Sequence, residues 1–497
     1  MSSENASSPI PKVIIPTKNV IVDGVLRYPV TGSKALIVGA GVGGLMTALE
    51  CWRKGIEVEV VEKADVLPGN GDMFGIGPSG VTTFHHYPSM MKKYDETAWD
   101  SQLSFQARDG TETLRAEFEY NRQGVAPHGA YPLRVKTTMG RYRCAQMLYG
   151  QCKRLGIPIR FGVSIEKYEE DTTKGVAIAI AHDGRQYTAD VVVAADGVGT
   201  KSHCITLGHP VRAIKTGYEV YRAMYSLKDI KDAPVIEETL RNLETPLMML
   251  LQAEKVHAVA SISHEHVSIG ITTEDDDKTI AESWSNTVSN ETALSKLTNP
   301  ETWSPLIREI ILHAPENSIV RWSLCFRDPQ PRWTSAGGRI VQLGDSAHSF
   351  LPTSGNGAVQ SLEDAASLGE CLRLAGKGNE GIATKVHEKL RYQRVSLIQH
   401  TGFVNMQDVH REVDLQKPPN RLMLQGKWLW GHSPEKYATE NFAKARAHLE
   451  DGSPFENTNL PPGHKWSDWT MESEFAKHKA GIDTTEEIKG NGYWGLV

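Results

Sequence analysis

Three glycines near the start of the chain have the spacing of a phosphate-binding turn. Gly39, Gly41 and Gly44 follow the G-x-G-x-x-G pattern, directly after the apolar run 35–38. The first glycine permits a tight turn, the second lets the backbone approach a diphosphate, and the third lets a helix pack on a strand. Glu62 follows about 20 residues after the turn, where a carboxylate can accept hydrogen bonds from a ribose. The spacing predicts a dinucleotide site.

The residues around this turn predict the elements that must position it. The run 35–38 suits a buried parallel strand, residues 46–53 are rich in helix formers, and a second apolar strand ends at Glu62. A lone glycine-rich turn can exist without a ligand. Here the strand, the helix and the acid agree, which favours a ligand.

Two further acid and glycine pairs follow apolar strands later in the chain. Asp196-Gly197 ends the run DVVVAAD, and Gly344-Asp345 follows the short strand RIVQL. A glycine-rich loop then leads to a helix that is expected to begin near Gly357. The N-terminus of a helix presents unpaired N–H groups and positive dipole, so this loop is a second ligand-binding candidate.

The order of these strands predicts interleaved domains. An α/β domain with a Rossmann-like parallel sheet is expected to bind the dinucleotide, and a smaller domain of antiparallel strands and helices to bind the substrate. The first is assigned residues 31–105, 135–213 and 326–400, and the second residues 106–134 and 214–325. The remaining segments are expected to be a poorly ordered extension at residues 1–30, C-terminal helices at residues 401–450, and a polar tail or wrapping segment at residues 451–497.

Composition excludes several other classes of protein. The 54 basic and 60 acidic residues give a net charge of −6, which offers no argument for a nucleic-acid partner. The sequence carries no secretory leader and no apolar run of about 18 residues, so no transmembrane segment is expected. Six scattered cysteines without a C-x-x-C pair indicate reduced thiols in a cytoplasmic protein and no metal site.

The three motifs together resemble the single-component (class A) FAD-dependent monooxygenases of the aromatic-hydroxylase type. The resemblance covers most of residues 34–450. Within that group the chain is most similar to fungal salicylate-hydroxylase-like proteins, through GYEVYRA at residues 217–223, Trp333 and the block GDSAHSFLP at residues 344–352. The last block is the most specific of these signals.

The resemblance implies FAD as the cofactor and gives the later loop its roles. Asp345 would bind the ribityl hydroxyls of the flavin, and Pro352 would lie against the isoalloxazine ring, close to where oxygen reacts. The backbone amides of Gly355, Asn356 and Gly357 would stabilise negative charge on the reduced ring.

The resemblance also suggests roles for residues between the motifs. Arg141 corresponds best to the family arginine at the ribityl-phosphate portion of the flavin, with Arg143 as the competing candidate and a solvated first-turn residue as the alternative. Asp196, with Gly197, would act at the diphosphate and along the path of the nicotinamide donor.

Three side-chain hypotheses concern the substrate domain and the catalytic loop. Arg222 could pair with an acidic or phenolate group of a substrate, or only with a neighbouring carboxylate such as Glu219. His348 is expected to be a packed or backbone-bonded histidine and not a catalytic base. Met248 and Met249 are expected in the core of a sheet.

The resemblance implies a reaction in which NADH or NADPH reduces the flavin and O2 forms a flavin C(4a)-hydroperoxide. Its distal oxygen would hydroxylate or epoxidise an electron-rich aromatic, indole or alkene small molecule, in fungal secondary metabolism. Only one G-x-G-x-x-G, at residues 39–44, directly follows an apolar strand, so no separate nicotinamide domain is expected. That observation argues against Baeyer-Villiger and N-oxidising flavoproteins.

Three alternatives remain: a flavin-dependent halogenase, an FAD-dependent reductase or dehydrogenase, and a non-catalytic nucleotide-binding protein. Halogenases need a W-x-W-x-I-P stretch, whereas Trp428-Leu429-Trp430 is followed by Gly-His-Ser. The non-catalytic alternative is disfavoured because the block at residues 344–352 serves the reactive ring itself.

Overall fold

The computed structural model describes residues 18–67, 69, 72–122, 134–228, 230–253, 255–275, 285–409 and 426–495. The predicted extension as far as residue 17, and parts of the predicted segments 106–134, 214–325, 401–450 and 451–497, lie outside the described residues.

A five-stranded parallel sheet forms the centre of the first domain. Its strand order is β20-β13-β3-β4-β9, and each neighbouring pair is parallel. The predicted Rossmann-like α/β domain with a parallel sheet is therefore confirmed. The strands are β3 (Lys34–Val38), β4 (Glu57–Val61), β9 (Ile159–Arg160), β13 (Val191–Ala194) and β20 (Ile340–Gln342).

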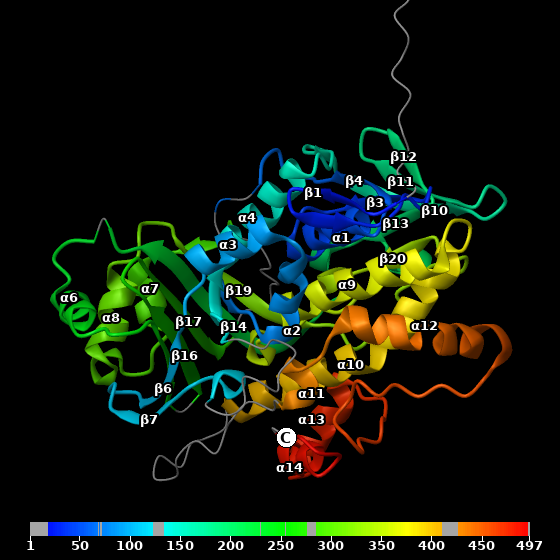
Figure 1. Ribbon diagram of the computed structural model, residues 1–497. Helices are drawn as coiled ribbons and strands as arrows, with labels where there is room; N and C mark the ends of the chain where they lie inside the picture. The colour runs from blue at the N-terminus through cyan, green and yellow to red at the C-terminus, as the bar shows by residue number, and fades with distance from the viewer. Residues whose placement is uncertain are drawn as a thin grey trace, which may run out of the picture.

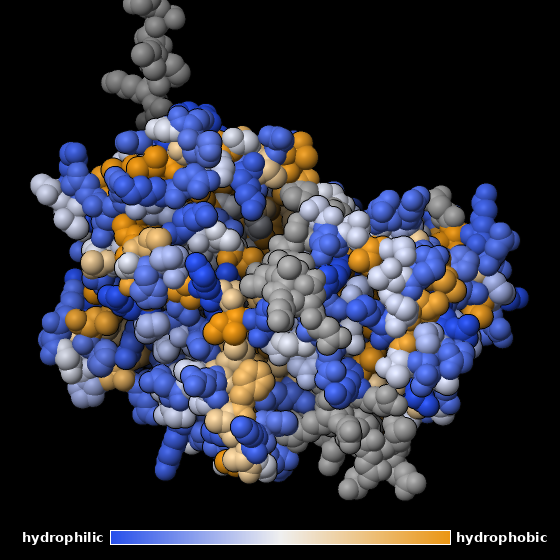
Figure 2. Space-filling view, turned by 180° about the vertical axis from the view of Figure 1, so that it is seen from behind, coloured by the Kyte–Doolittle hydropathy of each residue, from blue (hydrophilic) through white to orange (hydrophobic). Residues whose placement is uncertain are grey.

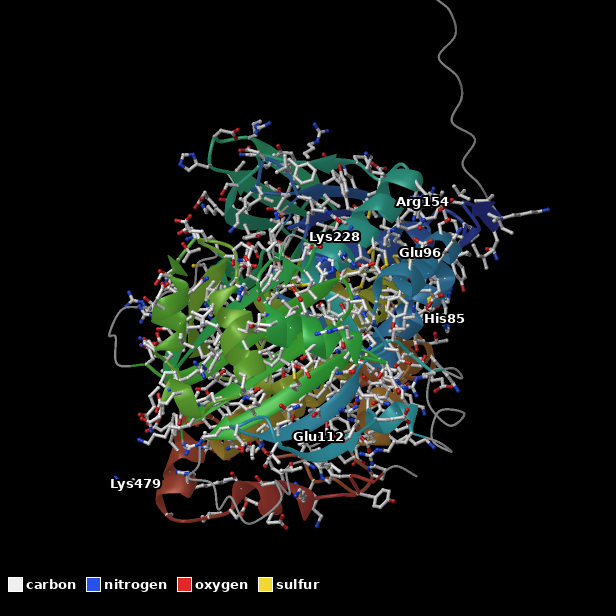
Figure 3. The ribbon with its side chains drawn as sticks, turned by 90° about the vertical axis from the view of Figure 1, so that its left-hand side faces the viewer. His85, Glu96, Glu112, Arg154, Lys228 and Lys479 are labelled. Atoms are coloured by element: carbon white, nitrogen blue, oxygen red, sulfur yellow. The ribbon has the colours of Figure 1, made fainter. Side chains whose placement is uncertain are left out.

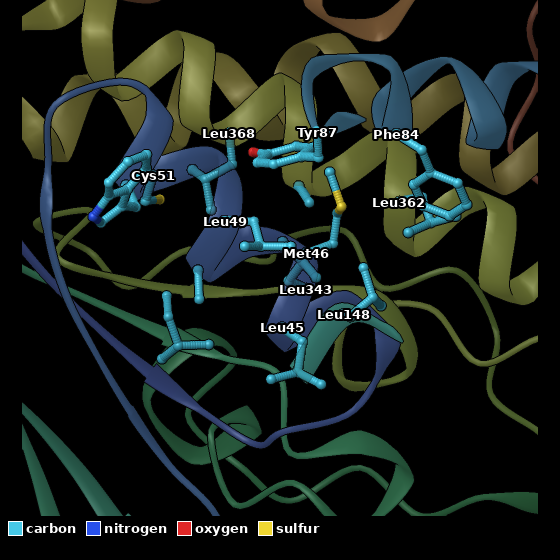
Figure 4. Close-up of a cluster of buried hydrophobic side chains, with 14 of the residues drawn as sticks. Leu45, Met46, Leu49, Cys51, Phe84, Tyr87, Leu148, Leu343, Leu362 and Leu368 are labelled. Atoms are coloured by element: carbon cyan, nitrogen blue, oxygen red, sulfur yellow. The ribbon is translucent and has the colours of Figure 1, made fainter. Parts of the chain in front are cut away.

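Two helices bury one of the two apolar faces of this sheet. α1 (Val42–Arg53) and α9 (Gly357–Ala375) pack against each other through leucines such as Leu49 and Leu368, as Figure 4 shows. Helix α9 begins at Gly357, where the sequence predicts it. Other helices complete this part of the chain: α2 (Pro78–Val81), α3 (Pro88–Thr97), α4 (Arg141–Arg154), α5 (His203–Thr206), α10 (Glu380–Val409), α11 (Lys427–Trp430) and α12 (Pro434–Asp451).

An eight-stranded sheet of order β18-β19-β14-β17-β16-β15-β6-β7 forms the second domain. Its pairs are antiparallel except β15 with β6, so the expected purely antiparallel sheet is corrected at one pair. The parallel pair arises because β6 comes from the early insertion rather than from a hairpin with β15. The strands are β6 (Gln102–Ala107), β7 (Glu112–Ala116), β14 (Ile214–Ser226), β15 (Leu247–Ala253), β16 (Val256–Ile262), β17 (His266–Glu274), β18 (Thr287–Val288) and β19 (Ile319–Phe326).

Among the described residues, the helices of the second domain cover only one face of the large sheet, whereas α10 packs on part of the other face through Phe403. Figure 1 shows α6 (Pro234–Arg241), α7 (Asn290–Leu294) and α8 (Pro305–Leu312) on the side away from the parallel sheet. Met249 packs in the core under these helices, as predicted, whereas Met248 on the opposite face packs against the core of the first domain. The uncovered face therefore meets the first domain.

The N-terminal residues that the structure describes are ordered, which corrects part of the predicted extension. β1 (Val20–Val22) and β2 (Val25–Arg27) form a hairpin, and Val25 is fully buried because Tyr28 N–H donates to Arg53 C=O and draws the segment onto α1. Two further small sheets pair β5 (Met73–Gly75) with β8 (Thr138–Gly140), and β11 (Val176–Ala181) with β10 (Ile165–Asp171) and β12 (Gln186–Ala189).

The polar C-terminal segment wraps across the junction of the two domains, which is one of the two forms expected for it. α13 (Met471–Lys479) and α14 (Thr484–Lys489) lie beside α10, and Trp469 stacks on His400 at 4.4 Å between ring centroids. Hydrophilic residues cover most of the face seen in Figure 2. Figure 3 views the large sheet from its outer side and places Glu112 on the edge strand β7, far from Arg154 at the end of α4.

Candidate active site

The predicted cofactor motifs meet at one edge of the parallel sheet. Gly39 and Glu62 directly follow β3 and β4, and Asp196 and Gly344 come two residues after the ends of β13 and β20. These four strands are neighbours in the sheet. Because the strands are parallel, their carboxyl ends lie side by side. The motifs therefore line up along the sheet in the order Gly344-Asp345, Asp196, Gly39 and Glu62, which is the position where open α/β sheets bind nucleotides.

Backbone atoms pack closely against two glycines of the turn, whereas the space beside the third glycine is open. Gly39 has φ of +109°, and a Cβ there would lie 2.3 Å from the Ala195 carbonyl oxygen. A Cβ on Gly44 would lie 2.0 Å from the Gly39 carbonyl oxygen. A Cβ on Gly41, at the N-terminus of α1, would meet nothing within 4 Å. This open space beside a helix N-terminus fits the diphosphate of a dinucleotide.

Glu62 is fixed by the turn that it faces. Its Oε2 accepts the Ala40 N–H at 2.7 Å, and its Oε1 accepts the Ala64 N–H at 2.9 Å. Each carboxylate oxygen can accept a second hydrogen bond. The half-buried carboxylate is therefore oriented at the strand end and keeps capacity for ribose hydroxyls.

Asp196 is held between two side chains at the end of β13. The Tyr168 hydroxyl donates to Asp196 Oδ2 at 2.6 Å, and the Ser346 hydroxyl donates to Oδ1 at 3.1 Å. Burial raises the pKa of Asp196, although these hydrogen bonds lower it. Gly197, with φ of +77°, donates its N–H to Ser346 Oγ at 2.8 Å. The second and third motifs therefore form one hydrogen-bonded unit.

Asp345 projects from a turn that is anchored on α9. The turn Gly344–Ser346 is buried except for Asp345, which is exposed at the end of β20. Asp364 on α9 accepts the Gly344 N–H at 3.2 Å and lies 2.6 Å from His348 Nε2. The buried His348 also packs on Trp333, so the prediction of a packed histidine is confirmed, with a carboxylate as its partner.

The loop before α9 exposes the residues that the sequence selects. Pro352 and Gly355 are exposed, and Gly355 takes φ of +61°. Asn356 donates its side-chain amide to the Ser354 carbonyl at 2.6 Å, so this side chain supports the loop. The Gly357 backbone begins a helix of 19 residues, long enough to give its N-terminus a substantial positive dipole.

A buried ion-pair network under this loop has no role in the sequence-based prediction. Arg391 donates to Asp364 Oδ1 at 2.8 Å and to Glu363 Oε2 at 2.6 Å, and Arg394 also donates to Glu363. Burial raises the pKa of Glu363, but Arg394 and Arg391 outweigh it and hold this pKa well below its usual range. The i, i+3 spacing of the two arginines on α10 is a signal that could have indicated a shared partner.

Arg222 lies on the face of the large sheet that the helices leave uncovered. Its guanidinium lies 4.9 Å from the ring centroid of Trp322, and its Nη1 lies 3.3 Å from Asp72 Oδ2. Glu219 points to the opposite face, where it pairs with Arg321 at 2.5 Å. Glu219 is therefore not its partner, because the two side chains are separated by an odd number of strand positions, but the expected carboxylate partner is present as Asp72.

The two candidate arginines of α4 point to different surroundings. Arg143 Nη2 lies 3.2 Å from His266 Nε2 and 3.6 Å from Glu265 Oε2, both of the second domain. Arg141 is exposed. Burial lowers the pKa of Arg222, and the positive charge of Arg141 lowers it further. Both arginines therefore lie close to the second domain, and the assignment of Arg141 to the flavin stays a prediction.

The loop of the third motif contacts the sheet that carries Arg222. Leu351, next to Pro352, shares an apolar cluster with Val220 of β14. The same cluster includes Phe403 of α10 and Trp469. Loop, sheet and C-terminal segment thus pack together at the junction of the two domains.

The comparisons with known proteins agree with this geometry. The family described as FAD binding domain matches residues 33–392. The FAD-dependent monooxygenase fsr3 of Gibberella fujikuroi is 36% identical over 465 residues, which cover 92% of this chain and 89% of that protein. The chain belongs to the FAD-dependent monooxygenase family. It is an oxidoreductase that binds FAD, and this class uses NAD(P)H and O2.

Two further comparisons support the same assignment of this monooxygenase. The FAD-dependent monooxygenase mdpD of Emericella nidulans is 36% identical, over 94% of this chain and 91% of that protein. The crystal structure of CtdE in complex with FAD and a substrate has a TM-score of 0.75 and 25% identity, covering 84% of this chain and all of that one. The resemblance inferred from the motifs is therefore confirmed.

Two further observations concern the helices of this monooxygenase and the extent of the family match. In the part of the chain that the structure describes, no helix combines the length and apolar character needed to cross a bilayer. The family match ends at residue 392, whereas Arg394 and Trp469, which support the loop, lie beyond it.

Proposed function

We propose that this monooxygenase hydroxylates or epoxidises an electron-rich aromatic, indole or alkene small molecule between its two domains. The observation that carries the proposal is that the exposed Pro352 follows Leu351, which packs on Val220 of the strand that also carries Arg222, while the same loop leads into the N-terminus of α9. A ring held at that loop would face both the N-terminus of α9 and the uncovered sheet.

The first half of the proposed FAD site binds the ADP portion. Gly39, Gly41 and Gly44 let the diphosphate approach the N-terminus of α1, and Glu62 accepts hydrogen bonds from the ribose. Asp196 and Gly197 stand beside the diphosphate and the approach of the nicotinamide donor.

The second half binds the flavin portion. Asp345 accepts hydrogen bonds from the ribityl hydroxyls, and Arg141 contacts the ribityl phosphate. Pro352 lies against the ring, and the amides from Gly355 through Asn356 to Gly357 stabilise negative charge on its pyrimidine edge. When bound, FAD takes up a hydride from NADPH or NADH and activates O2.

The uncovered sheet face supports an aromatic substrate. A row in register across it consists of Phe105, Leu250, Val259, Gly270 and Arg222. Gly270, beside Arg222, leaves room where other positions carry apolar side chains. This row can bury a flat apolar ring and exclude water from the reacting edge, while Arg222 pairs with an acidic or phenolate group.

The fungal relatives suggest the metabolic role of the enzyme, and its free cysteines suggest the cellular compartment. Fungal relatives of this class act in secondary metabolism, which we infer for this enzyme as well. All six cysteines are free, which supports the expected location in the cytoplasm.

The experiment that tests this function is a screen of the purified, FAD-loaded enzyme with phenols, indoles and isolated alkenes. Stimulated NAD(P)H oxidation together with a product 16 mass units heavier supports oxygen insertion. Halide-dependent products would indicate a halogenase, and oxidation of NAD(P)H without oxygen consumption would indicate a reductase. Failure to retain FAD, even when it is added, would leave only a non-catalytic nucleotide-binding protein.

A further inference from the structure

A two-stranded ribbon of the first domain lies on the sheet face that carries Arg222. β5 and β8 form this ribbon, in which Met73 pairs with Gly140. Met73 Sδ lies 4.0 Å from Ser268 Oγ, and a Cβ on Gly140 would lie 3.1 Å from Met224 Cε. Ser268 and Met224 are register partners, and Met224 follows Arg222 by two strand positions. Because side chains two positions apart share a face, the ribbon packs beside Arg222.

Asp72 directly precedes β5 and connects the ribbon to Arg222. Its carbonyl accepts the Arg141 N–H at 2.8 Å, and its Oδ1 accepts the Met73 N–H at 2.7 Å. Its Oδ2 lies 3.3 Å from Arg222 Nη1. The backbone of Asp72 is therefore fixed at the start of α4, while one carboxylate oxygen faces the arginine that the proposed function assigns to the substrate.

The contact between Asp72 and Arg222 has the geometry of an exchangeable ion pair. Its single distance of 3.3 Å exceeds the roughly 2.7–2.9 Å of a strong charge-assisted hydrogen bond. Arg321 on the neighbouring strand β19 differs, because its Nε lies 2.5 Å from Glu219 on the opposite face of the sheet. The closer pair supports the sheet, whereas the longer pair can open.

The burial of Arg222 decides what can take the place of Asp72. The Arg222 side chain is only 15% exposed, and its guanidinium lies 4.9 Å from the ring centroid of Trp322. Trp322 can hold the guanidinium in place while its ionic partner changes. A charge with so little access to water destabilises the protein when it is left without a partner. A ligand that displaces Asp72 must therefore bring its own negative charge.

We propose that Asp72 is a specificity-determining residue, which competes with the acidic or phenolate group of a substrate for Arg222. An anionic ring must displace Asp72, whereas a neutral ring binds beside the intact pair. Asp72 thus lowers the affinity for anionic aromatics and leaves the affinity for neutral ones unchanged, which widens the substrate range toward neutral rings. The proposal rests on the proposed function, because that function places the substrate at Arg222.

Equilibrium binding to the oxidised FAD-loaded enzyme tests this proposal, with benzoate and its neutral isostere benzamide as probes. The change in flavin absorbance reports binding, and the ratio of the benzoate affinity to the benzamide affinity measures the preference for the anion. We expect Asp72→Asn to raise this ratio at least about fivefold, because the amide cannot neutralise Arg222. FAD content should stay the same.

Three further variants separate this role from a structural one. Asp72→Glu should keep the ratio of the unaltered protein, because it keeps the charge. Asp183→Asn should also keep it, because Asp183 is an exposed carboxylate paired with Arg185 on another turn. In Arg222→Ala, adding Asp72→Asn should have no effect on the ratio, because both changes act through the same guanidinium.

Four results would overturn the proposal. They are an unchanged ratio in Asp72→Asn, a rise of similar size when Asp72→Asn is combined with Arg222→Ala, binding of neither probe to any of these proteins, and loss of FAD in Asp72→Asn, which would assign Asp72 to the cofactor site. Because binding is measured without turnover, a failure of the proposed oxygenation would appear separately, in the substrate screen.

Discussion

The Ser346 hydroxyl donates to Asp196 Oδ1 at 3.1 Å and accepts the Gly197 N–H at 2.8 Å, although the two motifs are 150 positions apart in sequence. One buried hydroxyl therefore couples the end of β13 to the end of β20. The relationship is structural evidence that the second and third motifs act as one binding surface.

Replacing this hydroxyl should weaken both motifs. Ser346→Ala leaves the Gly197 N–H and the buried Asp196 carboxyl short of partners, which we expect to cost about 1–3 kcal/mol of folding stability. Thermal unfolding of the apoprotein measures this loss, and a fluorescence titration with FAD should show weaker binding. Ser318→Ala is the control, because the Ser318 hydroxyl is buried and has no hydrogen-bond partner within the described residues. If the two variants unfold at the same temperature and bind FAD equally tightly, the hydrogen bonds of Ser346 do not stabilise the two motifs.

Asp345 should contribute to FAD binding and little to folding, because it is exposed on an anchored turn. Loss of charge-assisted hydrogen bonds to hydroxyls predicts FAD affinity lower by about ten- to a hundredfold in Asp345→Ala. FAD titration of the apoprotein measures this change, alongside Asp183→Ala as an exposed control on another turn. Normal flavin content and turnover in Asp345→Ala would refute its assigned role.

The parallel sheet and the motifs at its edge can be predicted from the sequence because the signals for them are local. Each motif follows its own apolar strand and precedes a glycine turn, so the signal lies within a few residues, as for Gly39 and Gly344. The strand order is the only further information that the site needs, because it places the carboxyl ends of these strands next to one another.

Features that depend on distant pairing could not be predicted in the same way. Strand alternation alone places Arg222 and Glu219 on opposite faces, but the pairing of Arg222 with Asp72 depends on how a segment 150 residues earlier packs on this sheet. The parallel pairing of β6 with β15 likewise depends on where the early insertion docks. The network of Glu363 with Arg391 joins two helices whose packing no local pattern specifies.

Arg222 should act on substrate and not on FAD retention. We expect Arg222→Ala to keep FAD but to lose most of the substrate-stimulated rate of flavin reduction, because a buried cation that pairs with the substrate is missing. Arg222→Lys should restore only part of the stimulation, since lysine cannot reproduce the guanidinium stacked near Trp322. Anaerobic stopped-flow measurements with and without substrate provide the readout, with the exposed Arg115→Ala as control. Unchanged stimulation in Arg222→Ala would make the residue purely structural.

Folding stability should fall in mild acid because of a buried neutral histidine. Burial lowers the pKa of His387 to about 4, whereas the unfolded chain binds this proton near pH 6.5. The stabilisation is therefore complete above about pH 6.5 and is lost as pH falls toward 4, at roughly 1.4 kcal/mol per pH unit.

Denaturant unfolding between pH 7.5 and 4.5 checks this expectation. His387→Gln should flatten the decline, and the exposed His182→Gln should not. A decline of equal steepness in His387→Gln and the unaltered protein would contradict the assignment.

The most direct test of monooxygenation is product analysis under ¹⁸O₂, with the purified FAD-loaded enzyme, NADPH and a substrate that stimulates NADPH oxidation. The account predicts one ¹⁸O atom in each product molecule and one NADPH oxidised per product formed. Product oxygen that comes only from water, or product formed equally well without O₂, would contradict it.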